Sequence, residues 1–468
     1  MTSASSALKG AGVDSADFNG DGFSDLAISA TYAVINGSER AGAIGVLYGS
    51  AAGMGKQNSA LITEASPGVP GTPGYGHDWG AIQGHGDLDG DGFDDLLVSG
   101  RRLAEKYQYL VLWGGKAGLS GGTLVPAGVP STTVSRLTPE RASVADVNGD
   151  GIADIAGKGY LGIGAQTGTG LRTMLGPFSR TTGKPTTTKY RATGVLDRLL
   201  AVHPAVGDIT DDGRADVVTQ VADANYRITN IVYKGTSTGA FVKANSLSPD
   251  WGKPGYWKNA AFGDINGDGY RDFVAGSIPG SGDNLIGRIH VAYGGPEGFS
   301  TTIPARTYRQ STAGVPGTND RADEWGVAVA MGDTDGDGYA DIVIGAPREA
   351  AADGTRWTGA VTVLRGSAGG VTTTGAKLIT QNTSGVPTAS EEFDLFGTAV
   401  SAIDSDNDGH SEVYVGGPGQ DKFGGRVWKL PSGSSGVTGT GATSFRPTDF
   451  AGFGSPIGET KFGAVLTR

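Results

Sequence analysis

One acidic nine-residue motif recurs seven times along the chain, and this repeat constrains the fold more strongly than any other feature. The copies read DFNGDGFSD from Asp17, DLDGDGFDD from Asp87, DVNGDGIAD from Asp146, DITDDGRAD from Asp208, DINGDGYRD from Asp264, DTDGDGYAD from Asp333 and DSDNDGHSE from Asp404. Their starts are 70, 59, 62, 56, 69 and 71 residues apart. Such a spacing indicates a repeat architecture, in which every unit buries its apolar surface against its neighbours.

Each unit contains apolar runs with the alternation that is typical of half-buried strands. One run follows the motif directly, as in DIVIGA at 341–346, and one ends in a glycine turn, as in VTVLRGSAGG at 361–370. Another precedes several motifs, as in WGVAVAMGD at 325–333, and the rest of each unit has room for a fourth strand. The 82 glycines favour many tight turns between short strands. We therefore predict an all-β fold, a seven-bladed β-propeller of four-stranded antiparallel blades in which residues 1–468 form one domain.

The ends of the chain predict how this ring closes. The last residues, KFGAVLTR at 461–468, match the opening of a blade's first strand, but no acidic motif follows them. The first motif, at Asp17, follows the segment KGAGVDSA, which lacks an aromatic-glycine pair. We expect Phe462–Leu466 to supply the innermost strand of blade 1, so that the N- and C-terminal segments close the ring.

The acidic motif has the ligand layout of a calcium loop. Calcium takes six to eight oxygen ligands, which the side chains at positions 1, 3, 5 and 9 and the carbonyl at position 7 can supply. Glycine stands at position 6 in all seven copies, where a sharp left-handed turn is needed. An EF-hand sensor is not expected, because position 12 never carries its bidentate glutamate and strands follow the motif. The predicted ligands of up to seven structural Ca2+ ions are Asp17, Asn19, Asp21, Phe23, Asp25, Asp87, Asp89, Asp91, Phe93, Asp95, Asp146, Asn148, Asp150, Ile152, Asp154, Asp208, Thr210, Asp212, Arg214, Asp216, Asp264, Asn266, Asp268, Tyr270, Asp272, Asp333, Asp335, Asp337, Tyr339, Asp341, Asp404, Asp406, Asp408, His410 and Glu412.

Charge supports the same interpretation. The carboxylates at positions 1, 3, 5 and 9 number 24, which is half of the chain's 48 acidic residues. Without a cation, three or four carboxylates within one turn repel one another. Seven bound Ca2+ ions would change the formal net charge from -11 to +3. Two loops are weaker, because Thr210 stands at position 3 of the fourth and Glu412 at position 9 of the seventh, so we expect those two to lose metal first.

Together these elements resemble the FG-GAP repeat family, the propeller type of integrin α-chains, and in particular its secreted actinobacterial FG-GAP/VCBS members. The matching residues are the WG pair at 325, the FG pair at 396, the acidic loop at 333 and GAP at 345–347. The segments TPERASVAD and LAVHPAVGD, before the third and fourth loops, lack the aromatic-glycine opening, so we expect irregular first strands there. The resemblance implies a calcium-binding propeller outside the cell, where calcium modules bind at about 10⁻⁴ to 10⁻³ M.

Composition narrows the possible partners. A formal net charge of -11 without a basic stripe argues against nucleic acid, and no apolar run is long enough to span a bilayer. Cysteine is absent, so no disulfide or thiolate site holds the fold. The opening MTSASSALKG lacks the regions of a signal peptide, so we expect a secreted monomer whose leader is absent from this chain.

Catalytic signatures are weak. GTSTG at 235–239 fits a nucleophile elbow by letter, and GKGYLG at 157–162 fits a dinucleotide loop, but no helix pattern follows either. We therefore assign no catalytic residue.

The less regular loops carry the candidate binding residues. If metal occupies the connections from strand one to strand two, then the connections from two to three and from blade to blade lie on the opposite face. Exposed aromatic side chains there can stack on sugar rings, and arginines can bind carboxylates. The candidate ligand-binding residues are His77, Arg101, Arg102, Trp251, Trp257, Arg348, Arg356 and Trp357, whereas Trp79 and Trp325 are expected to fill core positions.

We therefore expect a secreted, calcium-stabilised propeller that acts as an extracellular binding or adhesion module for a glycan, a surface polymer or a protein ligand. The alternative is an enzyme, a polysaccharide lyase or glycoside hydrolase, that uses the central funnel on the face opposite the calcium loops. Propellers host both functions, so the fold alone does not decide between them.

Overall fold

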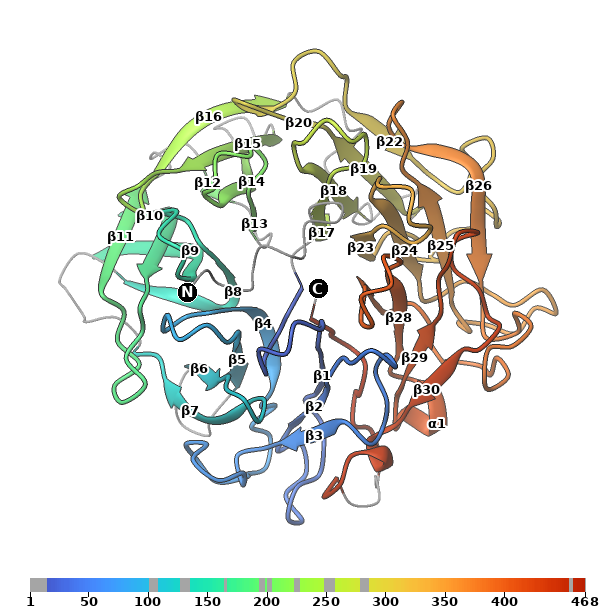
Figure 1. Ribbon diagram of the computed structural model, residues 1–468, viewed down its shortest axis with the longest axis horizontal. Coiled ribbons are helices and arrows are strands. Elements are labelled where there is room, and N and C mark those ends of the chain that lie inside the picture. Colours follow the sequence, from blue (N-terminus) through green and yellow to red (C-terminus); the bar gives the residue numbers. More distant parts are fainter. Residues whose placement is uncertain are drawn as a thin grey trace.

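The computed structural model is a ring of seven antiparallel sheets, the blades, arranged around a central axis (Figure 1). This confirms the predicted seven-bladed propeller. The structure describes residues 15–100, 108–126, 135–163, 166–192, 198–199, 204–222, 228–247, 257–277, 286–453 and 458–467.

The strands follow one another around the ring in chain order. Blade 1 contains β1 (Leu26–Ala30), β2 (Ala43–Leu47) and β3 (Ser59–Ile62), and blade 2 contains β4 (Ala81–Gly86), β5 (Asp95–Gly100), β6 (Gln108–Trp113) and β7 (Ser120–Leu124). Blade 3 contains β8 (Ser135–Ala145), β9 (Asp154–Ile163), β10 (Gln166–Leu175) and β11 (Thr187–Ala192), and blade 4 contains β12 (Arg198–Leu199), β13 (Ala205–Gly207), β14 (Asp216–Ala222), β15 (Ile228–Gly235) and β16 (Phe241–Leu247).

The second half of the ring is built in the same way. Blade 5 contains β17 (Trp257–Gly263), β18 (Asp272–Ser277), β19 (Arg288–Ala292) and β22 (Arg306–Tyr308), with a small ladder of β20 (Gly294–Gly295) and β21 (Gly298–Phe299) beside it. Blade 6 contains β23 (Ala328–Gly332), β24 (Asp341–Ala346), β25 (Ala360–Arg365) and β26 (Thr372–Ile379). Blade 7 contains β27 (Ala399–Ile403), β28 (Glu412–Gly417), β29 (Arg426–Leu430) and β30 (Thr443–Phe445), a helical turn α1 (Gln420–Phe423) and a 3-10 turn (Pro447–Asp449).

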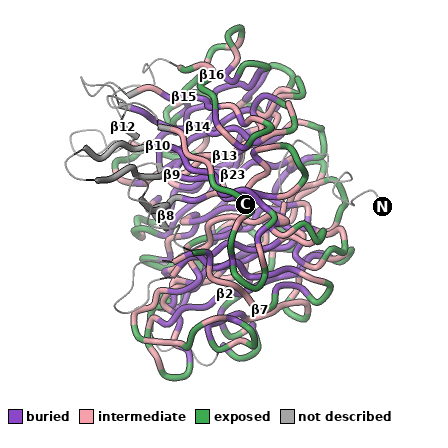
Figure 2. Tube along the Cα trace, turned by 90° about the vertical axis from the view of Figure 1, so that its left-hand side faces the viewer, coloured by how far each residue is buried: buried purple, intermediate pink, exposed green. Residues whose placement is uncertain are grey.

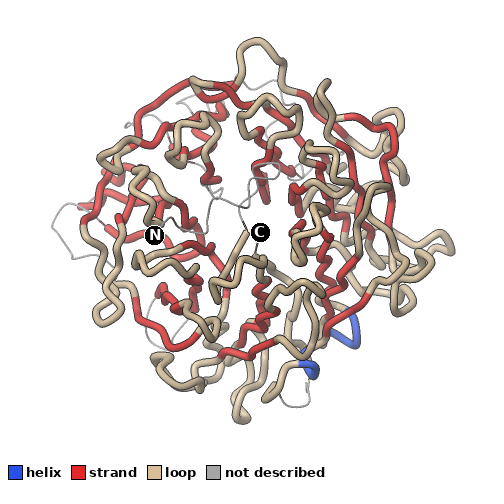
Figure 3. The backbone as a smooth tube through the Cα atoms, in the orientation of Figure 1, coloured by secondary structure: helices blue, strands red, loops and turns tan. Residues whose placement is uncertain are grey.

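Burial follows from radial packing. The second strand of each blade has a neighbouring blade on both faces, so its side chains read as a continuous apolar run, and every residue of β24 is buried. The outermost strands face solvent along one side, and β26 accordingly mixes exposed and half-buried residues. Figure 2 shows this distribution as purple strands enclosed by green loops, and Figure 3 shows the strands of each blade placed one after another from the centre of the ring to its rim.

The aromatic-glycine pairs form the junctions between blades. Trp79, Trp325, Phe396 and Phe462 are at most 5% exposed, and each is followed by a glycine with φ between 81° and 94°. A Cβ on Gly326 would lie 2.7 Å from the carbonyl oxygen of Arg288 in the preceding blade, and the other three glycines meet an equivalent carbonyl at 2.6–2.8 Å. The repeated pair therefore combines a buried anchor with a backbone approach that only glycine allows.

The C-terminal segment closes the ring against blade 1, as expected for the predicted fold (Figure 1). The backbone N–H of Ser29 donates to the Val465 carbonyl at 3.0 Å, and the N–H groups of Gly463 and Thr467 donate to Ser29 and Ala27 at 3.1 and 3.0 Å. From the N-terminal side, Ala16 forms a bridge with Asp25. Both terminal segments therefore contribute to the innermost edge of blade 1.

The first strands of blades 3 and 4 are irregular, as their sequences indicate. The pairing of β8 with β9 shifts register between Leu137 and Ala142. In blade 4 the first position is shared by β12 and β13, which both pair with β14. Without an aromatic anchor and its glycine, nothing in the sequence fixes a single register at these two junctions.

Candidate metal loops and binding face

The seven acidic loops occupy equivalent places in the ring. In blades 2 to 7 the loop leads from the innermost strand position to the next strand, as between β4 and β5 or between β23 and β24. In blade 1 it leads from the bridge residue Ala16 to β1, so all seven loops lie on one face. In the sixth loop Asp333 Oδ1 accepts the N–H groups of Gly336 and Asp337 at 2.7 and 3.2 Å, and its Oδ2 accepts that of Gly338 at 2.8 Å. The position-6 glycines have φ between 80° and 91°. The carboxylate at position 1 thus holds each turn closed, and the left-handed glycine permits it.

The carboxylate at position 9 anchors the loop to the blade. The six aspartates at this position are fully buried, and Glu412 is 3% exposed. Asp341 Oδ2 accepts the N–H of Thr334 at 3.2 Å, and its Oδ1 accepts that of Gly366, after the third strand, at 2.9 Å. Asp25, Asp95, Asp154, Asp216 and Asp272 make the same two kinds of contact.

Burial also makes these acids resist ionisation. Desolvation raises the pKa of Asp25 and Asp95 to about 8, although their backbone hydrogen bonds act in the opposite direction. The same cause raises the pKa of Asp341 to about 6 and that of Glu412 to about 7. A cation bound beside such a carboxylate would stabilise its charged form, so loop ionisation and cation binding favour each other.

Three loops already gather their acids. Carboxylate oxygens lie within 4.8 Å of one another in the sets Asp87, Asp89 and Asp95, then Asp333, Asp335 and Asp337, then Asp404, Asp406 and Asp408. The Oδ1 atoms of Asp335 and Asp406 are buried and accept no hydrogen bond. A donor set made only of oxygen atoms, with buried oxygens that lack a partner, suits a hard cation. These acidic groups could therefore hold a metal, while the full set of ligands in all seven loops stays a prediction.

The fourth loop uses its positions 3, 5 and 9 for contacts within the protein. The Thr210 hydroxyl donates to Asp216 Oδ2 at 2.9 Å, and Arg214 Nη2 lies 2.7 Å from Asp212 Oδ2. The seventh loop gathers its acids despite Glu412. That these two loops lose metal first stays a prediction.

The opposite face carries unusual backbone and exposed aromatic rings. Among the described non-glycine residues, fifteen have positive φ, and all but Asp211 and Asn407 lie in the connections of this face. The exposed aromatic side chains Tyr75, Trp357, Phe393 and Phe423 lie there as well. Left-handed backbone in residues other than glycine costs free energy and concentrates at functional sites.

Trp357 and Phe393 form the centre of this face between blades 6 and 7. They are 39% and 38% exposed, and their rings pack edge to face with centroids 5.0 Å apart. The Arg348 guanidinium lies 4.9 Å from the centre of the Trp357 ring, and its Nη1 lies 3.1 Å from Glu324 Oε1. The Arg356 carbonyl accepts the N–H of Phe393 at 3.3 Å. The structure therefore brings Arg348, Arg356 and Trp357 together, as candidates from the sequence, and adds Phe393 and Glu324.

The remaining sequence candidates lie elsewhere. His77 lies between blades 1 and 2, where its Nδ1 is 2.6 Å from Oε2 of the buried Glu64. Trp257 is 3% exposed and packs edge-on against Phe273 in blade 5, so its ring belongs to the core and we leave it out of the candidate face. Arg101, Arg102 and Trp251 lie outside the described residues.

Three blades place a residue at the same position on this face, half-buried in the case of Arg40 and exposed in the cases of Trp357 and Phe423. Arg40, Trp357 and Phe423 precede the third strand at equivalent places, each with positive φ and each accepting a backbone N–H from the next blade junction. Beside Arg40, the Tyr32 ring has the Arg40 guanidinium 4.2 Å and the Lys461 ammonium 3.9 Å from its centre. The sequence gives no sign that these positions are equivalent, because the side chains at the three places differ.

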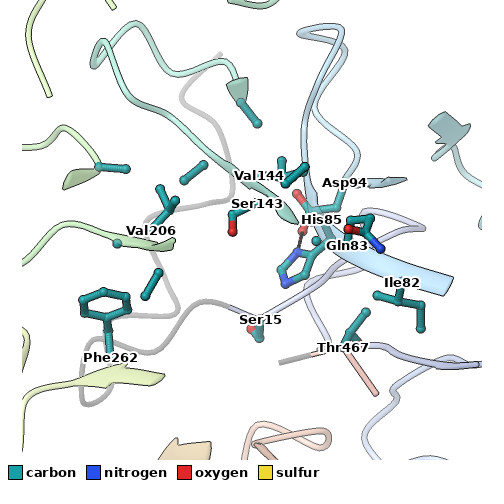
Figure 4. A pocket seen from close by; sticks show the side chains of 18 of the residues that line it. Ser15, Ile82, Gln83, His85, Asp94, Ser143, Val144, Val206, Phe262 and Thr467 are labelled. Atoms are coloured by element: carbon teal, nitrogen blue, oxygen red, sulfur yellow. Dashed lines mark hydrogen bonds and ion pairs between the residues drawn. The ribbon is translucent and has the colours of Figure 1, made fainter. Parts of the chain in front are cut away.

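A cavity of about 1340 Å³ lies at the centre of the ring, lined largely by small apolar side chains of the inner strands. Its polar sector contains Gln83, His85 and Asp94, where His85 Nδ1 lies 3.1 Å from Asp94 Oδ2 (Figure 4). No motif in the sequence points to His85. The available signal was Asp94, which is the only acidic residue at position 8 of any loop.

Models of known protein families match the repeated units of this sequence. A model described as FG-GAP repeat matches residues 10–47 and 325–364, and one described as FG-GAP-like repeat matches residues 87–157 and 208–275. These segments contain six of the seven acidic loops. The chain contains FG-GAP repeats.

Curated relatives of this FG-GAP propeller include integrin alpha pat-2 of Caenorhabditis briggsae, 30% identical over 311 residues, and that of Caenorhabditis elegans, 28% identical over 311 residues. Each alignment covers 65% of this chain and 21% of the relative, so the chain spans about a fifth of the length of these relatives.

Among solved structures, the FG-GAP propeller is similar to AofleA from Arthrobotrys oligospora, with 10% identity, a TM-score of 0.36 and coverage of 80% of this chain and 91% of that one. It is also similar to the Dos1 propeller, with 11% identity, a TM-score of 0.36 and coverage of 83% and 78%. Within the described residues, no helix has the length and apolar character needed to cross a membrane.

Proposed function

We propose that this protein is a secreted binding module whose ring is stabilised by calcium in the acidic loops and whose ligand binds on the opposite face. The observation that carries the proposal is the Trp357–Phe393 pair, two exposed aromatic rings held on left-handed backbone beside Arg348. Maintaining that arrangement has a free-energy cost that core packing does not explain, because neither ring is buried. Kinship with integrin alpha chains supports a place outside the cell.

The chemistry of this face favours a glycan or another surface polymer. An exposed aromatic ring offers an apolar surface that suits the face of a sugar, and a nearby guanidinium binds a carboxylate in a bidentate manner. Arg348 and the exposed Arg356 lie within the same connection as Trp357. We therefore propose an acidic glycan as the first ligand class to test, with a protein segment bearing acidic side chains as the second.

Calcium would act on the other face as a structural ligand. The acidic loops offer oxygen donors only, and Asp335 and Asp406 each present a buried oxygen without a partner. Ca2+ bound there would neutralise carboxylates that burial disfavours as charges, so the folded ring would gain stability by mass action. Millimolar calcium outside cells matches the affinity of extracellular calcium modules.

A glycan array tests the proposal, with binding measured both in chelator and in about 2 mM calcium, a concentration of the order that extracellular sites require. The double substitution Trp357→Ala with Phe393→Ala should abolish binding to any glycan that the wild-type protein retains. Val242→Ala is the matched control, because Val242 is also exposed but lies on β16. Binding that survives the double substitution unchanged would contradict the assignment of this face.

The alternative is a polysaccharide lyase or glycoside hydrolase that works at the central cavity. The His85–Asp94 pair is the specific observation in its favour, and it lies at the end of the cavity near the acidic loops rather than on the opposite face. A reducing-end release assay on acidic plant and microbial polysaccharides distinguishes the two functions. Release that His85→Ala abolishes would favour the enzyme, whereas binding without release would exclude it for those substrates.

A further inference from the structure

The seven acidic loops fall into classes according to position 3. Loops 2, 6 and 7 carry an aspartate there, namely Asp89, Asp335 and Asp406, and loops 1, 3 and 5 carry an asparagine, namely Asn19, Asn148 and Asn266. Loop 4 carries Thr210. With acids at positions 1, 5 and 9 in every loop, the aspartate class has a formal charge of four negative units and the asparagine class has three.

Each loop of the aspartate class receives a basic side chain from elsewhere in the fold. In loop 2 Arg180 pairs with both Asp89 and Asp91. In loop 6 Arg365, at the end of β25, pairs with Asp335. In loop 7 Lys429 Nζ lies 3.8 Å from Glu412 Oε2, and its charge acts to lower the pKa of Asp406 against the effect of burial.

The asparagine class shows no such pairing. Within the part of the chain that the structure describes, no ion pair involves the carboxylates at positions 1, 5 or 9 of loops 1, 3 and 5. Instead the asparagine Nδ2 donates to the acid at position 5, at 2.9 Å in all three loops. With one basic partner added to the aspartate class, both classes therefore reach the same formal charge of three negative units.

Arg180 makes this compensation across two blades. It belongs to the connection between β10 and β11 in blade 3, yet it contacts the loop of blade 2. Its guanidinium also lies 5.3 Å from the centre of the Trp113 ring and donates to the Gly114 carbonyl at 3.3 Å. A side chain packed in this way is held in place by the neighbouring blade.

We propose that Arg180, Arg365 and Lys429 are built-in counter-ions that bring the four-carboxylate loops to the formal charge of the asparagine class and thereby set their affinity for the cation. The inference rests on the proposed calcium role of the loops. Without the cation, the basic side chain relieves repulsion among four carboxylates. With the cation bound, the same positive charge opposes it, so a four-carboxylate loop binds about as tightly as a three-carboxylate loop.

The test uses Arg180, whose side chain is 43% exposed and whose removal leaves the core intact. Arg180→Met should raise the calcium affinity of loop 2 by about 10- to 100-fold and lower the melting temperature measured in chelator. Arg180→Lys keeps the charge and should leave both quantities near their wild-type values. Arg180→Met combined with Asp89→Asn restores the charge of three units and should return both quantities toward wild type.

Calorimetric Ca2+ titration measures the affinities, and Tb3+ luminescence sensitised by Trp113 identifies loop 2, because Trp113 lies beside it. If Arg180→Met binds calcium but the affinity of loop 2 is equal to or weaker than in the wild-type protein, the counter-ion proposal is overturned and the calcium role of the loops stands. Failure of Asp89→Asn to reverse the effects would also overturn it, because charge would then not be their cause. Absence of calcium uptake by the wild-type protein would overturn the calcium role and this proposal with it.

Discussion

Substituting Phe462 by alanine tests whether the ring depends on closure by its C-terminal segment. Phe462 is fully buried, and its ring centroid lies 5.5 Å from that of Phe450 and 6.4 Å from that of Phe453. It also forms the parallel bridge to Gly425 that Trp79 forms to Gly42 and Phe396 forms to Gly359. Phe462 is therefore the blade 1 counterpart of the aromatic anchors at the other junctions.

The expected magnitude follows from burial. Replacing a buried phenylalanine by alanine removes its transfer free energy and leaves a cavity, which typically costs about 3–5 kcal/mol of unfolding free energy. The loss should spread beyond blade 1, because the segment joins the first blade to the last and an open ring exposes two blade faces. Val465→Ala is the matched control, since Val465 lies in the same segment but is 37% exposed, and a surface change of this kind costs within about 0.5 kcal/mol.

Denaturant unfolding gives the free-energy change, and hydrogen exchange followed by mass spectrometry shows where it acts. In Phe462→Ala, amides of β24 in blade 6 should exchange faster together with those of β1, because both open in one cooperative event. Faster exchange confined to blade 1 would refute the argument that closure stabilises the whole ring. A midpoint shift no larger than that of Val465→Ala would refute the energetic estimate.

Two further predictions concern the cation and the protonation of buried acids. Chelation should lower the melting temperature markedly, and excess Ca2+ should restore it. The reason is that each occupied loop adds about 1.4 kcal/mol to the unfolding free energy at a calcium concentration ten times its Kd. A shift of the melting temperature under about one or two degrees would contradict the stabilising role. On the opposite face, burial, Glu349 and Asp320 raise the pKa of Asp323 to about 7 from 3.8, so the folded state keeps a proton that the unfolded state has lost and stability falls as pH rises through that window. The unfolding free energy of Asp323→Asn relative to wild type should therefore rise between about pH 4 and 7, by roughly 1–3 kcal/mol, and stay higher above pH 7. Asp353→Asn, at an exposed acid, is the control and should show no gain in this window. If the unfolding free energies of wild type and Asp323→Asn change with pH by the same slope, Asp323 does not titrate there.

The ring could be predicted from the sequence because its determinants are local and repeated. An aromatic-glycine pair, an acidic turn and a glycine after the third strand each have one physical role, and seven copies of that register leave little freedom. Even the irregular blades could be predicted, since β8 and the β12–β13 pair lie in or directly beside the two segments without an aromatic-glycine pair. The seven-loop ligand set has the same local character, although only the gathering of acids in three loops is seen directly.

The candidate binding face could be predicted only in part, because exposure is decided by contacts distant in the sequence. Trp257 and Trp357 both stand shortly before a strand or at its start, yet Phe273 covers the first and Phe393 leaves the second open on one side. The sequence does not indicate a partner for His77, because its partner Glu64 lies thirteen residues earlier, across a connection of irregular length. Phe393 gave no signal at all, because its left-handed backbone, and not its residue type, determines where the ring points.

Charge compensation in the loops shows that the repeats are not independent copies. A substitution from asparagine to aspartate at position 3 adds a carboxylate to a turn that already has three, and it would destabilise the ring in the absence of a cation. Arg180, Arg365 and Lys429 come from two structural contexts, a neighbouring blade in the case of Arg180 and a strand of the same blade in the other two. The fold therefore offsets the fourth carboxylate of each aspartate-class loop, although loop 4, with three acids, also pairs Asp212 with Arg214 and Lys234. On that reasoning, Asn148→Asp in loop 3 should be destabilising in chelator unless a basic side chain is placed beside it, and a melting temperature unchanged by that substitution would contradict the argument.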